Sequence, residues 1–361
     1  MGLDADARDG VKTGNTPHAK RPSCVRWAAL LVLDVCALGA TLACAAWLLG
    51  DRFWLFDLAA SFTPQAAAGA AALALVLLVL RRWVRAGVCA AACGVALLAF
   101  VPGRVLLPGE PLEESDRVRV LVANVLGRNA EADALLGVID REKPDVVIVL
   151  ETGLPLVEAL RDPGAAPALP HRFIADRAGP GFMVLLSRWP QRAQRPGDPD
   201  DPAQWAGGPA ATATALGRVA LIERPGGAFL MFGVHPDSPH RFDRWIGGNR
   251  RMRDVLARRE QILAFDPDLP SLIAGDLNAT PASVRTRLAR DADLRRAKPL
   301  LAPLRTGNLG GTWPAYAPGV LRVAIDGALI DRNTRVLAWH TVELRGSDHL
   351  GVVIDLEIPR D

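Results

Sequence analysis

The chain has 361 residues, more than one average domain, and its 42 Lys and Arg against 39 Asp and Glu give a formal net charge of +3. Residues 1–100 carry nine basic and six acidic side chains, whereas residues 101–361 carry 33 of each. Polynucleotide binders usually show an excess of Lys and Arg that neutralises phosphates. The balanced charge of residues 101–361 therefore argues against a dedicated DNA-binding protein, although it leaves room for a local basic face.

Residues 27–107, which follow a polar tail of residues 1–26, are dominated by Ala, Leu and Val. Three stretches approach the roughly 17–25 apolar residues that a transmembrane helix needs. The sequence therefore predicts membrane-spanning helices at about 27–50, 58–80 and 86–107. Asp34 lies within the first, where a carboxylate is costly unless it is protonated or paired. The alternatives for Asp34 are packing within a helical bundle and a role in substrate access or oligomer contact.

Basic residues in the connections predict an orientation. The tail contains five Lys and Arg residues and the second connection contains Arg81, Arg82 and Arg85, whereas residues 51–57 contain one Arg and two Asp. Connections rich in Lys and Arg stay in the cytoplasm, so the N-terminus is expected inside and the chain beyond residue 107 outside. All five cysteines lie in or beside the apolar region, and a cysteine-free remainder fits an extracytoplasmic location.

Residues 108–116 are a Pro- and Glu-rich linker, and residues 117–361 form the predicted catalytic domain. Apolar strands are expected there in alternation with helical segments such as residues 130–142. Their number predicts two sheets packed together with helices outside, and residues 195–208 are expected to form a surface loop. The expected strands are residues 118–124, 145–150, 182–187, 219–223, 229–235, 271–274, 324–330 and 352–358.

Polar side chains of the kinds used in catalysis lie where these strands end or begin. Carboxylates, amides and imidazoles placed in this way can converge on one rim of a pair of sheets. Each position alone is weak evidence, but six in one order predict a single site. They are Asn124, Glu151, His235, Asp276 with Asn278, Asp326, and the run Ser347, Asp348 and His349.

The motifs that contain these residues are VANV, IVLE, GVHP, AGDLNATP, GTWP, AID and GSDH. Over about residues 117–361 their order resembles the endonuclease/exonuclease/phosphatase superfamily. The HP and TWP details and the three preceding spans resemble bacterial membrane proteins of the YafD and VanJ type. The resemblance implies a DNase I-like α/β fold, a four-layered α/β/β/α sandwich, after a three-helix transmembrane region. It also implies hydrolysis of a phosphoester or phosphoanhydride.

The resemblance implies a metal site that holds Mg²⁺ or Mn²⁺. Glu151 would be the principal ligand, with Asn124 beside it and Asp348 as a further ligand or merely the cap of a turn. Oxygen ligands of this kind suit these hard cations. Many nucleases of the superfamily carry a second acidic residue where this chain has Leu126. That departure puts a second metal ion in doubt.

The resemblance also implies the catalytic roles. Asp276 would orient or deprotonate the attacking water, and Asn278 would hold the phosphate. Asp326 would fix the ring of His349, which would stabilise the developing charge or shuttle a proton. His235 would act on the leaving-group side.

Four further residues are candidates for substrate binding. Thr312 and Trp313 either support the phosphate pocket or pack against its rim. Arg250 and Arg253 belong to residues 241–260, which contain seven Arg and a Trp, Trp245, that is expected to be exposed. This segment could meet an anionic lipid or a pyrophosphate, and the alternative is a solvated helix with internal ion pairs. The remaining histidines at 171, 240 and 340 match no motif and are expected on the surface.

The leading functional hypothesis is a phosphatase that acts on a membrane lipid, because a short tether keeps the domain near the outer leaflet. The resemblance implies undecaprenyl pyrophosphate as substrate, the bacterial cytoplasmic membrane as location and a part in glycopeptide resistance. No obligate protein partner is implied. The alternative is a membrane-tethered nuclease that acts on extracellular DNA or RNA. A scaffold with a decayed site is disfavoured because Asp276, Asn278, Asp326 and His349 are all present.

Overall fold

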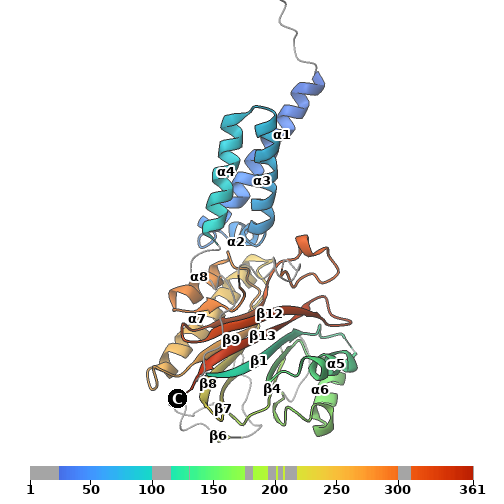
Figure 1. Ribbon diagram of the computed structural model, residues 1–361, viewed down its shortest axis with the longest axis vertical. Coiled ribbons are helices and arrows are strands. Elements are labelled where there is room, and N and C mark those ends of the chain that lie inside the picture. The colour runs from blue at the N-terminus through green and yellow to red at the C-terminus, as the bar shows by residue number, and fades with distance from the viewer. Residues whose placement is uncertain are drawn as a thin grey trace, which may run out of the picture.

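The computed structural model describes residues 24–99, 115–129, 131–174, 182–193, 201, 206–207, 218–299 and 310–360. A bundle of helices from the N-terminal part stands on one end of a domain built from two sheets (Figure 1). The predicted tail, most of the predicted linker, the last part of the third predicted span and nearly all of the predicted 195–208 loop lie outside the described residues.

The first sheet contains six strands in the order β12–β13–β1–β2–β4–β3. β1 and β2 are parallel, and all other neighbours are antiparallel. The strands are β1 (Ser115–Asn124), β2 (Val146–Leu150), β3 (His171–Phe173), β4 (Met183–Ser187), β12 (Arg335–Glu343) and β13 (Leu350–Pro359).

The second sheet contains seven strands in the order β10–β11–β9–β8–β7–β5–β6. It also has a single parallel pair, β8 with β9. The strands are β5 (Gln191–Ala193), β6 (Ala206–Gly207), β7 (Arg218–Arg224), β8 (Gly227–Val234), β9 (Ser271–Asp276), β10 (Arg295–Arg296) and β11 (Asp326–Ile330).

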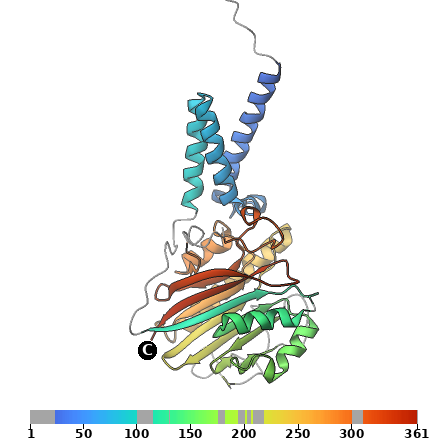
Figure 2. The same cartoon turned by 45° about the vertical axis from the view of Figure 1, so that its right-hand side comes forward.

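The two sheets pack face to face and helices cover their outer faces (Figure 2). The side chains of β1 explain this layered arrangement, because successive side chains of a strand point to opposite faces of the sheet. Val118, Val120 and Val122 enter the core between the sheets, whereas Leu121 and Ala123 join the cluster under the helices α5 (Ala132–Glu142) and α6 (Leu154–Arg161). α7 (Phe242–Leu263) and α8 (Val284–Asp291) cover the second sheet. The predicted pair of sheets with outer helices is confirmed.

β12 is the longest strand that the sequence did not predict. Its residues alternate irregularly between buried and partly exposed, and its register with β13 shifts between Val336 and Ala338. It lies at the edge of its sheet and carries Arg, His and Thr on its accessible side. A strand of this kind lacks the continuous apolar run that marks a strand covered on both faces.

The helical bundle differs from the three separate spans that the sequence predicted. It consists of α1 (Cys24–Ala45), α2 (Trp54–Ala60), α3 (Thr63–Val79) and α4 (Trp83–Leu98). Among the described residues, one helix, Trp27–Leu48, is by itself long and apolar enough to cross a membrane, and a second span results only if α2 and α3 are counted together. The chain bends by 67° between α2 and α3, and α4 is shorter than the predicted span of 86–107. Pro64 near the start of α3 lacks the N–H that would continue a helix from α2.

Candidate active site

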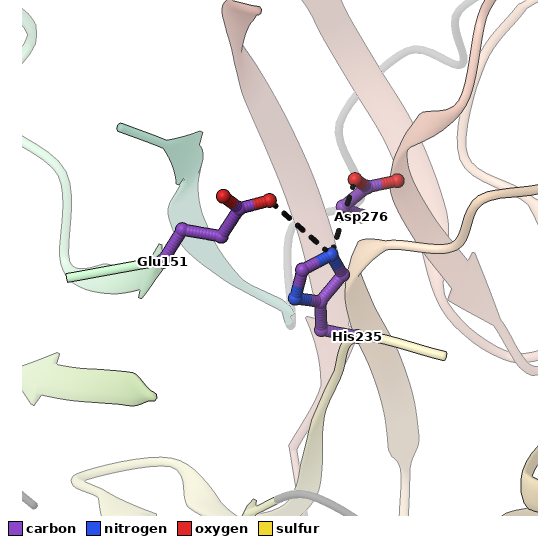
Figure 3. A group of neighbouring side chains, drawn as sticks. All are labelled: Glu151, His235 and Asp276. Atoms are coloured by element: carbon purple, nitrogen blue, oxygen red, sulfur yellow. Dashed lines mark ion pairs between the residues drawn. The ribbon is translucent and has the colours of Figure 1, made fainter. Parts of the chain in front are cut away.

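One parallel strand pair in each sheet brings functional side chains to the same rim. Asn124 is the last residue of β1 and Glu151 follows β2, while His235 follows β8 and Asp276 is the last residue of β9. Parallel strands place their carboxyl ends at one edge, so these four residues converge. One ligand atom each from Glu151, His235 and Asp276 lie within 4.8 Å of one another (Figure 3).

The Asp276 carboxylate lies at the centre of this group and is 2% exposed. Its Oδ2 accepts hydrogen bonds from the side-chain amides of Asn124 at 3.2 Å and Asn278 at 3.3 Å, and its Oδ1 accepts the backbone N–H of Asn278 at 2.8 Å. His235 Nε2 lies 3.5 Å from Asp276 Oδ2 and 3.6 Å from Glu151 Oε1. The imidazole therefore bridges the two carboxylates.

These contacts shift the ionisation of both partners. Burial opposes the charged form of each, but the hydrogen bond from His235 and the positive charges of both imidazoles lower the pKa of Asp276 below its ordinary value. Burial likewise opposes charge on His235, but its hydrogen bond to Asp276 and the nearby carboxylates raise the pKa of His235. Asp276 is thus held as an anion that can accept a hydrogen bond from water.

His349 and Asp326 form a second pair at the same rim. His349 directly precedes β13 and Asp326 begins β11, and Nδ1 of the ring lies 2.9 Å from Oδ2 of the carboxyl. Burial raises the pKa of Asp326. Burial also acts against charge on His349, but the Asp326 carboxylate outweighs it and raises the pKa of His349 to about 10. Nε2 of His349 lies 4.0 Å from Asp276, which joins the two groups.

Three residues at the site adopt a left-handed backbone conformation that non-glycine residues seldom take. Leu126 has φ 61°, Glu151 has φ 53° and Asn278 has φ 44°. Each lies one or two residues beyond the end of a strand, where the chain turns at the rim. Such conformations persist only where the surrounding structure holds them, and they concentrate at functional sites. Beside them, a Cβ on Gly275 would lie 1.9 Å from the Val234 carbonyl oxygen, so β8 and β9 require glycine to approach this closely.

Two arginines that match no motif hold the catalytic loops. The Arg285 side chain is 2% exposed and donates to the backbone oxygens of Asp237 at 2.7 Å and Asn278 at 3.0 Å. Arg251 donates to the backbone oxygen of His235 at 3.1 Å. Arg285 was not predicted, because an arginine on a polar helix is usually solvated. Arg251 belongs to the basic segment 241–260, but its contact with the backbone of His235 was not predicted.

The rim opens into a cleft of about 940 Å³ that contains Glu151, His235, Asp276 and His349. The cations Arg218, Arg244 and Arg251 and the exposed His240 also line it. His240 was expected only to be a surface residue, and its place at the cleft was not predicted. These cations can attract an anionic substrate towards the rim.

The predicted substrate-binding residues lie in different places. Trp313 lines the cleft and donates from Nε1 to Asp348 Oδ2 at 3.1 Å. Thr312 is buried, and its Oγ1 accepts the backbone N–H of Asp326 at 3.3 Å, which supports the strand end that carries this carboxylate. Arg250 and Arg253 are exposed on α7 and do not line the cleft.

The expectation that Trp245 is exposed is wrong. Its side chain is 9% exposed, and its Nε1 donates to Asp57 Oδ2 at 2.8 Å. The sequence could not indicate this burial, because the partner lies on α2, 188 residues away.

The side chains at the rim fit a hard divalent cation. Carboxylates from Glu151, Asp276, Asp326 and Asp348 outnumber the two imidazoles, so the site has an excess of negative charge. Among the described residues, Oδ1 of Asp348 is buried without a hydrogen-bond partner. Asn124 donates to Glu151 Oε1 at 2.9 Å and orients this carboxylate. Metal ligation by Asn124 and Asp348 stays a prediction.

The sequence matches a known protein family, and the fold has similar solved structures. Residues 121–349 match the Endonuclease/Exonuclease/phosphatase family. Among solved structures, the chain is similar to an endonuclease/exonuclease/phosphatase from Beutenbergia cavernae DSM 12333, with 20% identity, a TM-score of 0.44 and coverage of 67% of this chain and 72% of that one. It is similar to D. rerio TDP2 complexed with a single-strand DNA product, with 14% identity, a TM-score of 0.48 and coverage of 67% and 99%. It is also similar to a mannosyl-6-phosphatase from Bacteroides thetaiotaomicron VPI-5482, with 13% identity, a TM-score of 0.45 and coverage of 66% and 99%. No curated protein matches the sequence.

The His349–Asp326 pair predicts a pH dependence. In the wild-type protein the charged ring should persist up to about pH 10, and its contribution to stability, complete below pH 6.5, should be lost as the pH rises through about 10. Asp326→Asn removes the carboxylate while burial continues to oppose charge. The pKa of His349 should therefore fall, although Asp276 and Asp348 continue to favour the charged ring, and the alkaline limb of the pH profile of kcat should move from near 10 to a lower pH. An unchanged alkaline limb in this variant would show that the pair does not control the reaction.

Proposed function

Since the chain belongs to the endonuclease/exonuclease/phosphatase family and is a metal-dependent phosphoester hydrolase, we propose that its substrate is a lipid phosphate or pyrophosphate within a membrane. The observation that carries this proposal is the place of the helical bundle. α2 lies at the end of the domain that faces the bundle (Figure 1). Leu58, Ser61 and Phe62 line the same cleft as Asp276 and His349. The catalytic groups thus lie at the end of the domain where the apolar helices begin.

The bundle surface supports membrane insertion. Large apolar side chains such as Leu31, Val79 and Val84 are 65%, 81% and 82% exposed, whereas a water-soluble bundle buries an apolar stripe. Only 11% of the apolar window in helix Trp27–Leu48 is buried, and this helix is about 33 Å long, enough to cross a hydrocarbon core of about 30 Å. The charge on Asp34 is paired with Arg85 at 2.8 Å, which links α1 to α4. We extend the proposal to three crossings of the YafD and VanJ type, in which α2 and α3 together form one bent span.

Each residue at the rim has a separate role in the proposed hydrolysis. Glu151, with Asp276 beside it, would hold Mg²⁺ or Mn²⁺. When bound, the cation neutralises charge on the phosphate oxygens. Asp276 holds the attacking water and accepts its proton. His349, kept charged by Asp326, donates a hydrogen bond from Nε2 to the charge that develops on the phosphate.

The other two polar residues act on either side of the phosphate. His235 carries a raised pKa and can supply a proton to the leaving oxygen. The Asn278 amide, fixed by the Pro236 backbone oxygen at 3.0 Å, lines the cleft beside Asp276 and can hold a phosphate oxygen. The rim thus offers the Asp276 anion to the attacking water and the charged rings of His349 and His235 to the phosphate. Hydrolysis of an anionic ester requires groups of both kinds.

The substrate class can be decided with the full-length protein in detergent micelles. With Mg²⁺, phosphate should be released from undecaprenyl pyrophosphate, EDTA should abolish the release, and added Mg²⁺ or Mn²⁺ should restore it. Glu151→Gln should raise the Mg²⁺ concentration needed for half-maximal rate, because the variant loses an anionic ligand. Plasmid DNA in a parallel reaction should stay intact. Plasmid nicking without phosphate release from the lipid would replace the lipid proposal with the nuclease alternative.

The proposed topology places the active site outside the cytoplasm. Alkaline phosphatase fused after residue 361 should be active, because it folds only after export, and a green fluorescent protein at the same position should stay dark. The positive-inside rule gives this result for three crossings. An inactive phosphatase together with a fluorescent fusion would contradict the orientation.

A further inference from the structure

A buried carboxylate connects the helical bundle to two helices of the catalytic domain. Asp57 on α2 is 4% exposed. Its Oδ2 accepts the Trp245 indole N–H from α7 at 2.8 Å, and its Oδ1 accepts the backbone N–H of Val284, the first residue of α8, at 2.8 Å. Both oxygens are thus used to bind two different helices of the catalytic domain. Because the two hydrogen bonds run to two different helices, they fix both the position and the angle of α2.

Further contacts surround this carboxylate. Ala60 at the end of α2 is fully buried and packs against Ala282. Gln65 on α3 donates to the backbone oxygen of Arg322 at 3.1 Å, and Arg287 on α8 donates to the backbone oxygen of Trp47. These contacts join residues more than 200 positions apart. A directional set of hydrogen bonds defines one arrangement of the two parts, unlike a purely apolar contact that could slide.

The fixed position of α2 makes the corner between α2 and α3 part of the active-site cleft. Leu58, Ser61 and Phe62 line the same cleft as Asp276 and His349. Phe62 is 47% exposed, so its ring retains surface for a further contact. The cleft is therefore lined both by polar side chains from the sheets and by the apolar side chains Leu58 and Phe62 from the helical bundle. Trp313, 37% exposed, also lines the cleft and donates a hydrogen bond to Asp348.

We infer that the α2–α3 corner is the chain-binding subsite of the enzyme, and that Asp57 is the residue that positions it. A lipid phosphate carries its hydrocarbon chain on the ester oxygen, so a phosphate held at Asp276 and His349 leaves the first hydrocarbon units within the cleft that Leu58 and Phe62 also line. Leu58 and Phe62 supply apolar surface there, at the entrance to the bundle. This inference rests on the proposed function and deepens it by assigning the residues that recognise the lipid part of the substrate.

The test compares two pyrophosphates that share a head group and differ in chain length. Full-length protein in detergent micelles with Mg²⁺ is given undecaprenyl pyrophosphate or the short, soluble isopentenyl pyrophosphate, and kcat/KM is measured for each. Leu58→Ala and Phe62→Ala should each lower the long-chain to short-chain ratio of kcat/KM by about fivefold, mostly through KM, as expected for loss of part of an apolar contact. Both side chains are accessible from the cleft, so folding should survive.

Leu55→Ala is the matched control. Leu55 lies on the same helix, is 59% exposed and does not line the cleft, so its truncation should leave the ratio unchanged. An unchanged ratio in both Leu58→Ala and Phe62→Ala, with a wild-type enzyme that hydrolyses both pyrophosphates, would overturn the subsite while the proposed function stands. Failure of the wild-type enzyme on the long-chain pyrophosphate would overturn the proposed function and the subsite together.

The positioning role of Asp57 has a separate readout. Asp57→Ala should lower the same ratio, and Asp57→Asn, which keeps one oxygen acceptor, should restore part of it. Asp57 is proposed to position the α2–α3 corner that carries Phe62. Adding Phe62→Ala to Asp57→Ala should therefore lower the ratio little further. If the two substitutions lower the ratio by fully additive amounts in the double variant, Asp57 does not act by positioning the α2–α3 corner.

Discussion

The hydrogen bond from Asn124 to Asp276 joins the two sheets at the point where the chemistry takes place. Asn124 ends a strand of the first sheet and Asp276 ends a strand of the second, and the 3.2 Å contact requires both strand ends to meet at one rim. Asp276 also lies close to His235 and His349 and accepts a hydrogen bond from Asn278. Asn124 in turn donates a hydrogen bond to Glu151. The parallel pairs β1–β2 and β8–β9 are therefore the part of the fold on which the site depends.

Burying these carboxylates together is unfavourable, and the surrounding structure offsets the cost. Burial raises the pKa of Asp326, and the Asp276 charge adds to that rise, while the charge of His349 opposes it. Arg296 is fully buried and binds the backbone oxygens of Ala279, Ala324 and Asp326 behind the site. An unpaired buried charge is costly, so the imidazoles and amides are as necessary to the site as the acids.

The sequence predicted the residues that the structure brings together at the rim, because their positions follow from local pattern. Asn124, Glu151, His235 and Asp276 each follow or end an apolar strand, and an apolar run can be read without knowledge of the fold. Residues that act across the structure could not be found in this way. Arg285 was missed because its partners lie in loops up to 48 residues away.

The junction between bundle and domain was missed for the same reason. Asp57 was counted only as a charge in a connection between spans, and Trp245 only as an exposed aromatic ring, yet the two are hydrogen-bonded to each other. The spans predicted from hydropathy also did not take this contact into account. The bend between α2 and α3 brings a short helix against the catalytic rim, and hydropathy alone describes this region as one straight span.

In the proposed mechanism Asp276 activates the attacking water. This role is tested most directly by the turnover of full-length Asp276→Asn on isopentenyl pyrophosphate at saturating Mg²⁺. Asparagine keeps the size of the side chain but cannot accept the proton, so kcat should fall by more than about 10²-fold. The melting temperature should remain close to that of the wild type, which would show that the loss is catalytic. A folded variant that turns over within a few-fold of the wild-type rate would contradict the account.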